Sequence, residues 1–137
     1  MKYHILLAED HILFRQTIRK FLERFADLQV VGEAGDGLEL LEILKQSTPD
    51  LIILDISMPN LGGIEATRQI KLINPEIKVL IMTLHKNKEY VHNAISAGAE
   101  GYLLKDVAST ELLSAISIIR ERGTYISPLI SSQLHYN

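Results

Sequence analysis

Several features that would point to particular protein classes are missing from the sequence. It contains no cysteine and no tryptophan, and aromatic residues make up only 6% of its 137 residues. Without cysteine the chain cannot form disulfides, bind zinc through thiolates or use a thiol as a nucleophile. This absence fits a reducing compartment, so we expect a cytoplasmic location.

Long apolar runs are also missing. The longest unbroken runs are residues 5–8, 51–54 and 79–82, whereas a membrane-spanning helix needs roughly 20 apolar residues. The first run is interrupted by Glu9 and Asp10, too early for a secretory signal peptide. We therefore expect a soluble protein with no membrane partner.

A surplus of positive charge is absent too. The chain has 14 lysines and arginines against 17 aspartates and glutamates, a formal net charge of −3. Proteins that bind nucleic acid carry a basic surface, so we do not expect these residues to bind DNA. Hydrophobic residues make up 47% and charged residues 23%, a balance typical of one globular domain.

Short apolar runs alternate with amphipathic segments along the chain. The runs predict five strands, at residues 3–8, 29–34, 51–54, 78–82 and 101–104. Between and after them, apolar spacings of three and four predict helices that include residues 14–25, 38–44, 64–73, 90–97 and 112–119. Strict alternation is typical of an α/β fold, a doubly wound parallel sheet with helices on both faces.

The strand segments ILLA, LIIL and VLIM have no polar alternation, as expected for strands buried on both faces. The second and fifth strands are more mixed and are expected nearer the edges of the sheet. We assign residues 1–123 to the domain and residues 124–137 to a tail or to the start of a linker to a missing effector domain. Ser127 followed by Pro128 is typical of a helix start, so either a short helix over residues 128–134 or a frayed end is expected.

Polar side chains follow four of the predicted strands directly. Glu9 and Asp10 follow the first strand, Asp55 the third, Thr83 the fourth and Lys105 the fifth. Because ligands of open parallel sheets bind beyond the carboxyl ends of the strands, we expect these side chains to share one site.

Each of these residues also has a simpler interpretation when it is taken alone. Asp10 and Thr83 could cap a helix, and Lys105 could be a surface lysine. Asp55 is harder to explain, since a carboxylate at the end of a buried strand is costly unless something compensates its charge.

Three clustered carboxylates repel one another, and a divalent cation relieves that repulsion. Oxygen ligands favour Mg²⁺, which is commonly held together with phosphate oxygens. The combination with Lys105 and Thr83 therefore indicates a phosphate site in which a carboxylate is the nucleophile.

Three segments of the sequence resemble a response-regulator receiver domain. They are EDHILFRQ at the first turn, LIILDISMP around Asp55 and GAEGYLLKD around Lys105, and the first and last are similar to the NarL/FixJ (LuxR-like) branch. The resemblance covers about residues 3–123. It implies a five-stranded sheet in the order 2-1-3-4-5 and a switch that catalyses only its own phosphorylation and dephosphorylation, not an enzyme.

The resemblance also implies roles at the phosphorylation site. Asp55 would accept a phosphoryl group from a histidine kinase. Mg²⁺ would be bound directly by Asp10, Asp55 and the backbone carbonyl of Ser57, with Glu9 acting through water. Lys105 would pair with the phosphoryl oxygens.

Further positions correspond to the family's switch and timing residues. Thr83 would donate a hydrogen bond to the phosphoryl group, and Tyr102 stands at the aromatic switch position. Ser57 and His85 stand where the family tunes phosphoryl lifetime. A homodimer on phosphorylation is a further expectation, and DNA binding is expected only of a longer parent protein with a helix-turn-helix domain.

The sequence departs from the family pattern at three positions. Glu9 replaces the commoner aspartate, Ile12 stands where this branch often has proline, and Asp106 replaces a proline that is often in a cis bond. A cis bond before a residue other than proline costs roughly 2.5–4 kcal/mol, so we expect a trans bond between Lys105 and Asp106.

Two other functions would use the same region of the sequence. A Mg²⁺-dependent phosphohydrolase would use Asp55 as its nucleophile, but the residue two positions later is Ser57, a poor acid. A flavodoxin-like FMN binder would need a hydroxyl- and glycine-rich first loop, and EDHILF has two negative charges there instead. None of the five histidines has zinc spacing, and His11 is interpreted as a helix-start residue.

Overall fold

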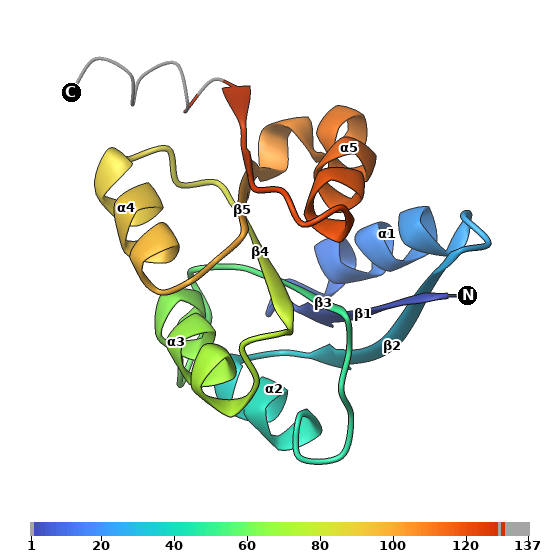
Figure 1. The fold of residues 1–137 in the computed structure, drawn as a ribbon, viewed down its shortest axis with the longest axis horizontal. Helices are drawn as coiled ribbons and strands as arrows, with labels where there is room; N and C mark the ends of the chain where they lie inside the picture. Colours follow the sequence, from blue (N-terminus) through green and yellow to red (C-terminus); the bar gives the residue numbers. More distant parts are fainter. Residues whose placement is uncertain (1, 129, 131–137) are drawn as a thin grey trace.

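A parallel sheet of six strands runs through the middle of the molecule (Figure 1). The computed structural model describes residues 2–128 and residue 130. The strands are β1 (Tyr3–Ala8), β2 (Leu28–Ala34), β3 (Leu51–Leu54), β4 (Lys78–Thr83), β5 (Gly101–Leu104) and β6 (Tyr125–Ile126). Their order across the sheet is β2-β1-β3-β4-β5-β6.

Helices cover both faces of the sheet. The α-helices are α1 (Ile12–Glu23), α2 (Gly37–Ile43), α3 (Gly63–Ile73), α4 (Lys88–Ser96) and α5 (Ala108–Arg120), and a 3-10 turn, η1, spans Lys105–Val107. Helices α1 and α5 lie side by side on one face, and α2, α3 and α4 lie on the other (Figure 1). The predicted doubly wound α/β fold and the order of its five strands are therefore confirmed. Within the described ranges, no helix is long and apolar enough to cross a membrane.

The sixth strand is an addition that the sequence did not predict. Tyr125 and Ile126 pair in parallel with Gly101 and Tyr102 of β5. The start of the predicted tail thus belongs to the sheet, and β6 rather than β5 forms that edge. The helix expected over residues 128–134 falls mainly outside the described residues.

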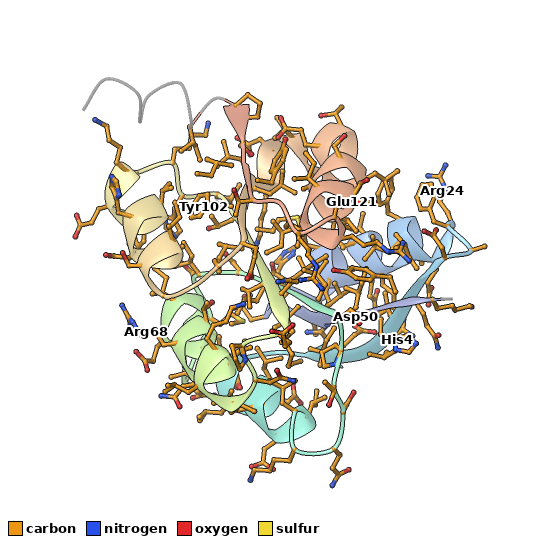
Figure 2. The ribbon with its side chains drawn as sticks, in the orientation of Figure 1. His4, Arg24, Asp50, Arg68, Tyr102 and Glu121 are labelled. Atoms are coloured by element: carbon orange, nitrogen blue, oxygen red, sulfur yellow. The ribbon has the colours of Figure 1, made fainter. Side chains whose placement is uncertain are left out.

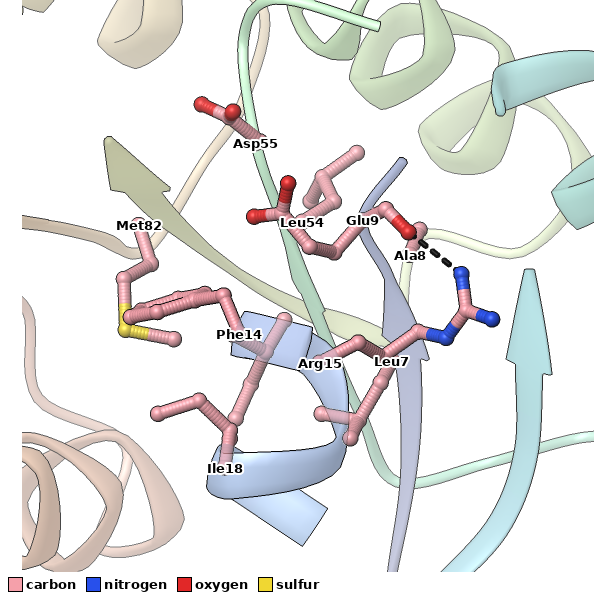
Figure 3. Close-up of a pocket in the computed structure, with 10 residues that line it drawn as sticks. Leu7, Ala8, Glu9, Phe14, Arg15, Ile18, Leu54, Asp55 and Met82 are labelled. Atoms are coloured by element: carbon pink, nitrogen blue, oxygen red, sulfur yellow. Dashed lines mark hydrogen bonds between the residues drawn. The ribbon is translucent and has the colours of Figure 1, made fainter. Parts of the chain in front are cut away.

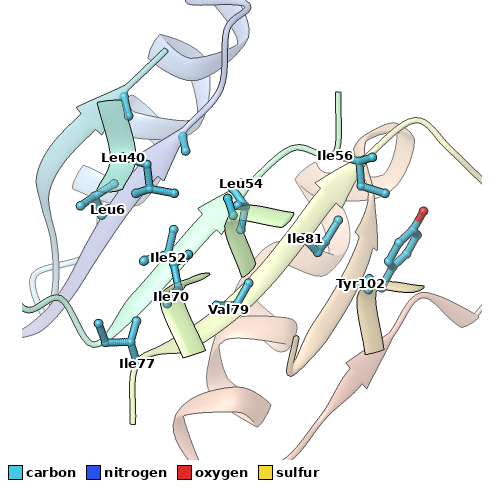
Figure 4. Packing of buried hydrophobic residues seen from close by; sticks show 14 of the residues in the cluster. Leu6, Leu40, Ile52, Leu54, Ile56, Ile70, Ile77, Val79, Ile81 and Tyr102 are labelled. Atoms are coloured by element: carbon cyan, nitrogen blue, oxygen red, sulfur yellow. The ribbon is translucent and has the colours of Figure 1, made fainter. Parts of the chain in front are cut away.

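The core has two layers because successive strand residues point to opposite faces. Leu6, Ile52 and Leu54 pack towards α2, α3 and α4 (Figure 4). Their neighbours in the chain pack towards α1 and α5, where Ile53 is an example. Charged side chains lie outside both layers: Arg24, Arg68 and Glu121, labelled in Figure 2, are exposed, whereas Tyr102 is buried.

The helix predicted over residues 38–44 is present as α2, and its leucines are buried to different extents. Leu38 is 53% exposed, whereas Leu40 is fully buried and Leu44 is 8% exposed. The reason is the packing of Gly37, whose amide donates to the Leu61 carbonyl at 3.1 Å. A Cβ atom on Gly37 would lie 2.4 Å from that carbonyl oxygen, so this close approach fixes how α2 is turned.

Candidate functional site

The predicted site residues lie together at the carboxyl ends of the central strands. Glu9 directly follows β1, Asp55 directly follows β3, and Lys105 directly follows β5. Ligand atoms of Glu9, Asp10 and Asp55 lie within 4.8 Å of one another. Glu9 and Asp55 are only 6% and 7% exposed, whereas Asp10 is exposed.

Lys105 neutralises part of this acidic cluster. Its Nζ atom lies 2.7 Å from Oε1 of Glu9 and 3.0 Å from Oδ2 of Asp55. The ammonium group also lies 4.7 Å from the centre of the Phe14 ring, a cation–π contact. A single positive charge is therefore shared by two buried carboxylates.

The loop after β3 holds Asp55 through close backbone contacts. The Asp55 amide donates to the Ala8 carbonyl at 3.2 Å, and the Gly63 amide donates to the Ile56 carbonyl at 2.9 Å. A Cβ atom on Gly63 would lie 2.1 Å from the Asp55 carbonyl oxygen. Only glycine lets α3 start this close to the acidic residue.

The helix after β1 is capped by His11 and not by Asp10. Nδ1 of His11 accepts a hydrogen bond from the Phe14 amide at 3.3 Å, which confirms the interpretation of His11 as a helix-start residue. Capping therefore does not explain the presence of Asp10, whose carboxylate remains available to the cluster.

Burial and pairing shift the ionisation of the site. Burial raises the pKa of Glu9 above its ordinary value, although hydrogen bonds from Lys105 and from the His11 amide act against this shift. Burial alone would lower the pKa of Lys105, but its hydrogen bonds to Glu9 and Asp55 outweigh burial and raise that pKa. Lys105 is consequently a fixed cation at neutral pH.

One oxygen of Asp55 is left without a partner. Oδ1 is buried and accepts no hydrogen bond from the described part of the chain, while Oδ2 accepts from Lys105. A buried carboxylate oxygen without a partner costs folding free energy unless a ligand binds to it. Because all the donors here are carboxylate oxygens, the cluster fits a hard divalent cation such as Mg²⁺.

The remaining predicted residues form a hydrogen-bonded chain beside the cluster. The hydroxyl of Ser57 lies 2.8 Å from Nε2 of His85, and the His85 amide donates to the Thr83 hydroxyl at 3.3 Å. The Tyr102 hydroxyl donates to the His85 carbonyl at 2.8 Å. Thr83 and Tyr102 are fully buried, and the Tyr102 ring therefore points into the protein interior.

Two further residues contact the site that the sequence analysis did not single out. Phe14 touches Lys105, as described above, and Nη1 of Arg15 donates to the Glu9 carbonyl at 2.5 Å (Figure 3). The groove in front of the cluster is lined by Glu9, Asp10, His11, Phe14, Asp55, Leu84, Lys105 and Asp106. The bond between Lys105 and Asp106 is trans, as expected, and none of the described peptide bonds is cis.

Comparison with known proteins agrees with this geometry. Residues 5–117 match the model of the response regulator receiver domain family. The chain is 35% identical over 133 residues to the transcriptional regulatory protein DegU of Brevibacillus brevis, which covers 97% of the chain and 56% of that protein. It is 43% identical over 115 residues to the uncharacterized transcriptional regulatory protein YxjL of Bacillus subtilis, covering 84% of the chain and 53% of that protein.

Solved structures give the same result. The crystal structure of a LuxR-family two-component response regulator from Aurantimonas superimposes with a TM-score of 0.94 at 34% identity, covering 99% of this chain and 97% of that one. The signal receiver domain of NarL from Mycobacterium tuberculosis gives a TM-score of 0.80 at 34% identity, with coverages of 85% and 94%.

These matches decide between the alternatives drawn from the sequence. The chain spans only about half the length of the curated relatives quoted above, 56% of one and 53% of the other. The receiver domain family is not one of classical enzymes, and the match to it sets aside the phosphohydrolase and flavin-binding alternatives. The chain belongs to the response regulator receiver domain family, in its LuxR-like branch.

Proposed function

We propose that this chain is a phosphorylation-controlled switch in which Asp55 accepts a phosphoryl group from a histidine kinase. The observation that carries the proposal is the free Oδ1 atom of Asp55, buried inside the acidic cluster. The other oxygen of the same carboxylate is held by Lys105, so the nucleophile is oriented before a phosphodonor arrives.

The transfer needs no further reactant. An oxygen of Asp55 attacks the phosphorus of a phosphohistidine, a P–O bond forms, and the P–N bond breaks with its electron pair returning to the kinase imidazole. The ammonium group of Lys105, which now lies against Asp55 and Glu9, then pairs with the phosphoryl oxygens. Burial of the Asp55 carboxylate limits the access of water to it.

Mg²⁺ fits the same cluster. Asp10, Asp55 and the backbone carbonyl of Ser57 would bind the ion directly, and Glu9 would act through water. When bound, Mg²⁺ neutralises the charge that accumulates when a phosphoryl group joins three carboxylates. The support is the set of three carboxylates within 4.8 Å of one another, with one buried oxygen still unpartnered.

Thr83 and Tyr102 would carry the signal away from Asp55. The Thr83 hydroxyl accepts a bond from the His85 amide, and the His85 carbonyl accepts a bond from Tyr102. If the Thr83 hydroxyl turns to donate to a phosphoryl oxygen, the backbone at His85 loses one of these two contacts. Ser57 and His85, whose side chains are hydrogen-bonded to each other, would set the lifetime of the phosphoryl group.

The output of the switch is proposed from relatives. DegU and YxjL are described as transcriptional regulatory proteins, and RcsB of the same fold has been solved as dimers bound to DNA. We propose that the receiver dimerises on phosphorylation and controls a DNA-binding domain in a longer parent protein. Residues 1–137, with a net charge of −3, are not proposed to contact DNA themselves.

Intact mass spectrometry tests the phosphorylation site. Incubation with acetyl phosphate and Mg²⁺ is expected to add one phosphoryl mass to the wild-type chain, and EDTA is expected to prevent the addition. Asp55→Asn should remove the added mass because an amide is not a nucleophile. Asp50→Asn is the matched control, because Asp50 lies at the opposite end of β3, where it accepts from the His4 amide at 2.8 Å. Equal labelling of the wild type and Asp55→Asn would refute the assignment.

A further inference from the structure

Arg15 of α1 contacts the start of the loop after β1, which carries Glu9 and Asp10. Nη1 of Arg15 donates to the Glu9 carbonyl at 2.5 Å, and Nε of Arg15 donates to Oε1 of Glu33 at 2.8 Å (Figure 3 shows the first contact). The Arg15 side chain is only 17% exposed. The guanidinium group thus connects the loop after β1 to the end of β2.

The Glu9 carbonyl is part of the peptide unit that leads into Asp10. Because a peptide unit is planar, holding its oxygen fixes the direction in which the chain enters Asp10. The next peptide unit is held as well, since the His11 amide donates to Oε2 of Glu9 at 3.1 Å. Both peptide units that flank Asp10 are therefore fixed by named contacts.

Asp10 has no such support for its own carboxylate. Across residues 2–128 and 130, nothing forms a hydrogen bond or ion pair with the exposed Asp10 side chain. Its carboxylate nevertheless lies within 4.8 Å of those of Glu9 and Asp55. The backbone on either side of Asp10 is what directs its side chain towards the cluster.

Glu33 explains why the bridging residue is an arginine. The two oxygens of Glu33 accept separately from Arg15 and Arg19, so the carboxylate orients the Arg15 guanidinium from the side away from the site. Arginine has donors on different edges of a rigid plane and can hold two acceptors in different directions. A lysine has one ammonium centre and can reach only one of them well.

We propose that Arg15 is a positioning residue for the metal-binding loop, acting on Asp10 through the Glu9–Asp10 peptide unit. The proposal rests on the proposed function, in which Asp10 binds Mg²⁺. Arg15 itself does not touch the metal or the phosphoryl group. Its replacement should therefore weaken metal binding even though Glu9, Asp10 and Asp55 are all still present in the chain.

The test compares two arginines that share Glu33. Arg15→Met removes an ion pair with Glu33 and the hydrogen bonds to the Glu9 and Ala34 carbonyls, whereas Arg19→Met removes ion pairs with Glu33 and Glu23. Mg²⁺ affinity is measured by titration of backbone amide NMR signals, and stability by urea unfolding of the same samples. Arg15→Met is expected to weaken Mg²⁺ binding by about 10-fold, the range typical of residues that orient metal ligands. Arg19→Met is expected to change it by less than about 2-fold, because Arg19 pairs with the same Glu33 carboxylate but, within the described part of the chain, forms no hydrogen bond or ion pair with the loop after β1.

A double-mutant cycle shows whether Arg15 acts through Asp10. Asp10→Ala removes the ligand that Arg15 is proposed to orient, so Arg15→Met in that background should weaken Mg²⁺ binding by less than about 2-fold. Arg15→Lys keeps the charge but not both contacts, so it should not restore wild-type affinity. This variant also serves if Arg15→Met does not fold.

Three results would overturn the proposal. They are equal Mg²⁺ affinities in Arg15→Met and Arg19→Met, additive losses in the cycle with Asp10→Ala, and wild-type affinity in Arg15→Lys. Failure of the proposed function is separate, because it would be seen as a wild-type chain that gains no phosphoryl mass from acetyl phosphate. Mg²⁺ affinities are measured without any phosphodonor, so the two failures can be distinguished.

Discussion

Lys105 lies closer to Glu9 than to the proposed phosphoacceptor. The distance from Nζ to the nearest carboxylate oxygen is 2.7 Å for Glu9 and 3.0 Å for Asp55. The positive charge of Lys105 lies beside the carboxylates that would bind a divalent cation, so it would oppose the binding of that cation.

Lys105→Gln is expected to have opposite effects on metal binding and on phosphorylation. Removing a positive charge beside the carboxylates should tighten Mg²⁺ binding, on the order of 10-fold. Phosphorylation by acetyl phosphate should become slower, because the phosphoryl oxygens lose their ammonium partner. Mg²⁺ titration and the rate of mass gain measure the two effects. Lys86→Gln is the control, because Lys86 is exposed and pairs with Asp106 at 3.3 Å.

Thr83→Ala is expected to separate phosphorylation from signalling. Asp55 should still gain a phosphoryl mass, but the NMR shift changes over residues 84–105 on phosphorylation should be much smaller than in the wild type. The reason is the Thr83 hydroxyl, which is bonded to the His85 amide and lies on the route to Tyr102. Thr110→Ala, which removes an exposed hydroxyl in α5, is the control. Wild-type shift changes in Thr83→Ala would mean that the signal takes another route.

Gly63→Ala is expected to destabilise the fold and to disturb Asp55. The added methyl group would lie 2.1 Å from the Asp55 carbonyl oxygen, so either the start of α3 or the loop after β3 has to move. Overpacking of this kind costs about 1–3 kcal/mol of unfolding free energy. Gly32→Ala is a matched control, because the nearest atoms to its Cβ lie 3.8 Å away. Urea unfolding compares the two, and equal stabilities would contradict the prediction.

The ion pairs of Glu33 predict a pH dependence of stability. Burial would raise the pKa of Glu33, but hydrogen bonds from Arg19 and Arg15 outweigh burial and lower that pKa below its ordinary value. A carboxylate with a lowered folded-state pKa stabilises the protein above its unfolded-state pKa, and that stabilisation is lost as the pH falls through the folded-state pKa.

Glu33→Gln should therefore reduce the unfolding free energy at pH 7 by about 1 kcal/mol, a modest value because the pair is partly exposed. The difference from the wild type should shrink as the pH falls below about 4.3. Urea unfolding at several pH values measures it. Glu42→Gln is the control, because Glu42 pairs only with the exposed Lys45. A difference that grows towards acid would contradict the assignment.

Ser127→Ala is expected to loosen the edge of the sheet. The Ser127 side chain is fully buried, and its hydroxyl accepts from the Leu104 amide at 3.0 Å. Removing the hydroxyl leaves that amide without an acceptor, which costs about 1–3 kcal/mol. Hydrogen exchange of the Leu104 amide should become faster, whereas the exposed Thr124→Ala should leave it unchanged. Unchanged exchange in Ser127→Ala would contradict this role.

The sequence predicted the acidic cluster because a general rule brings its residues together. Glu9, Asp55 and Lys105 each follow a parallel strand, and the carboxyl ends of neighbouring strands meet at one edge of the sheet. No such rule exists for Arg15, since its contact with Glu9 depends on how α1 is placed beside the end of β2. Its distance from Glu9 along the chain carries no recognisable pattern.

Two details of the fold have no clear signal in the sequence. Helix α2 has only seven residues, too few for the leucine spacing to show which of its sides is buried. Strand β6 has two residues, and its pairing with β5 is a long-range contact without a sequence signal of its own. In both cases contacts with neighbouring elements determine the structure, and the local sequence pattern does not specify those contacts.

Strand β6 has a practical consequence for hybrid regulators, in which a receiver is joined to a foreign output module. The Ser127 amide donates to the Tyr102 carbonyl at 2.9 Å, and Ile130 is buried in the same cluster as Tyr102. A fusion joined directly after α5 would strip these contacts from the strand that leads to Lys105. A junction placed beyond Ile130 keeps the outgoing chain bonded to β5, so a movement of that strand is passed on mechanically to whatever module is attached.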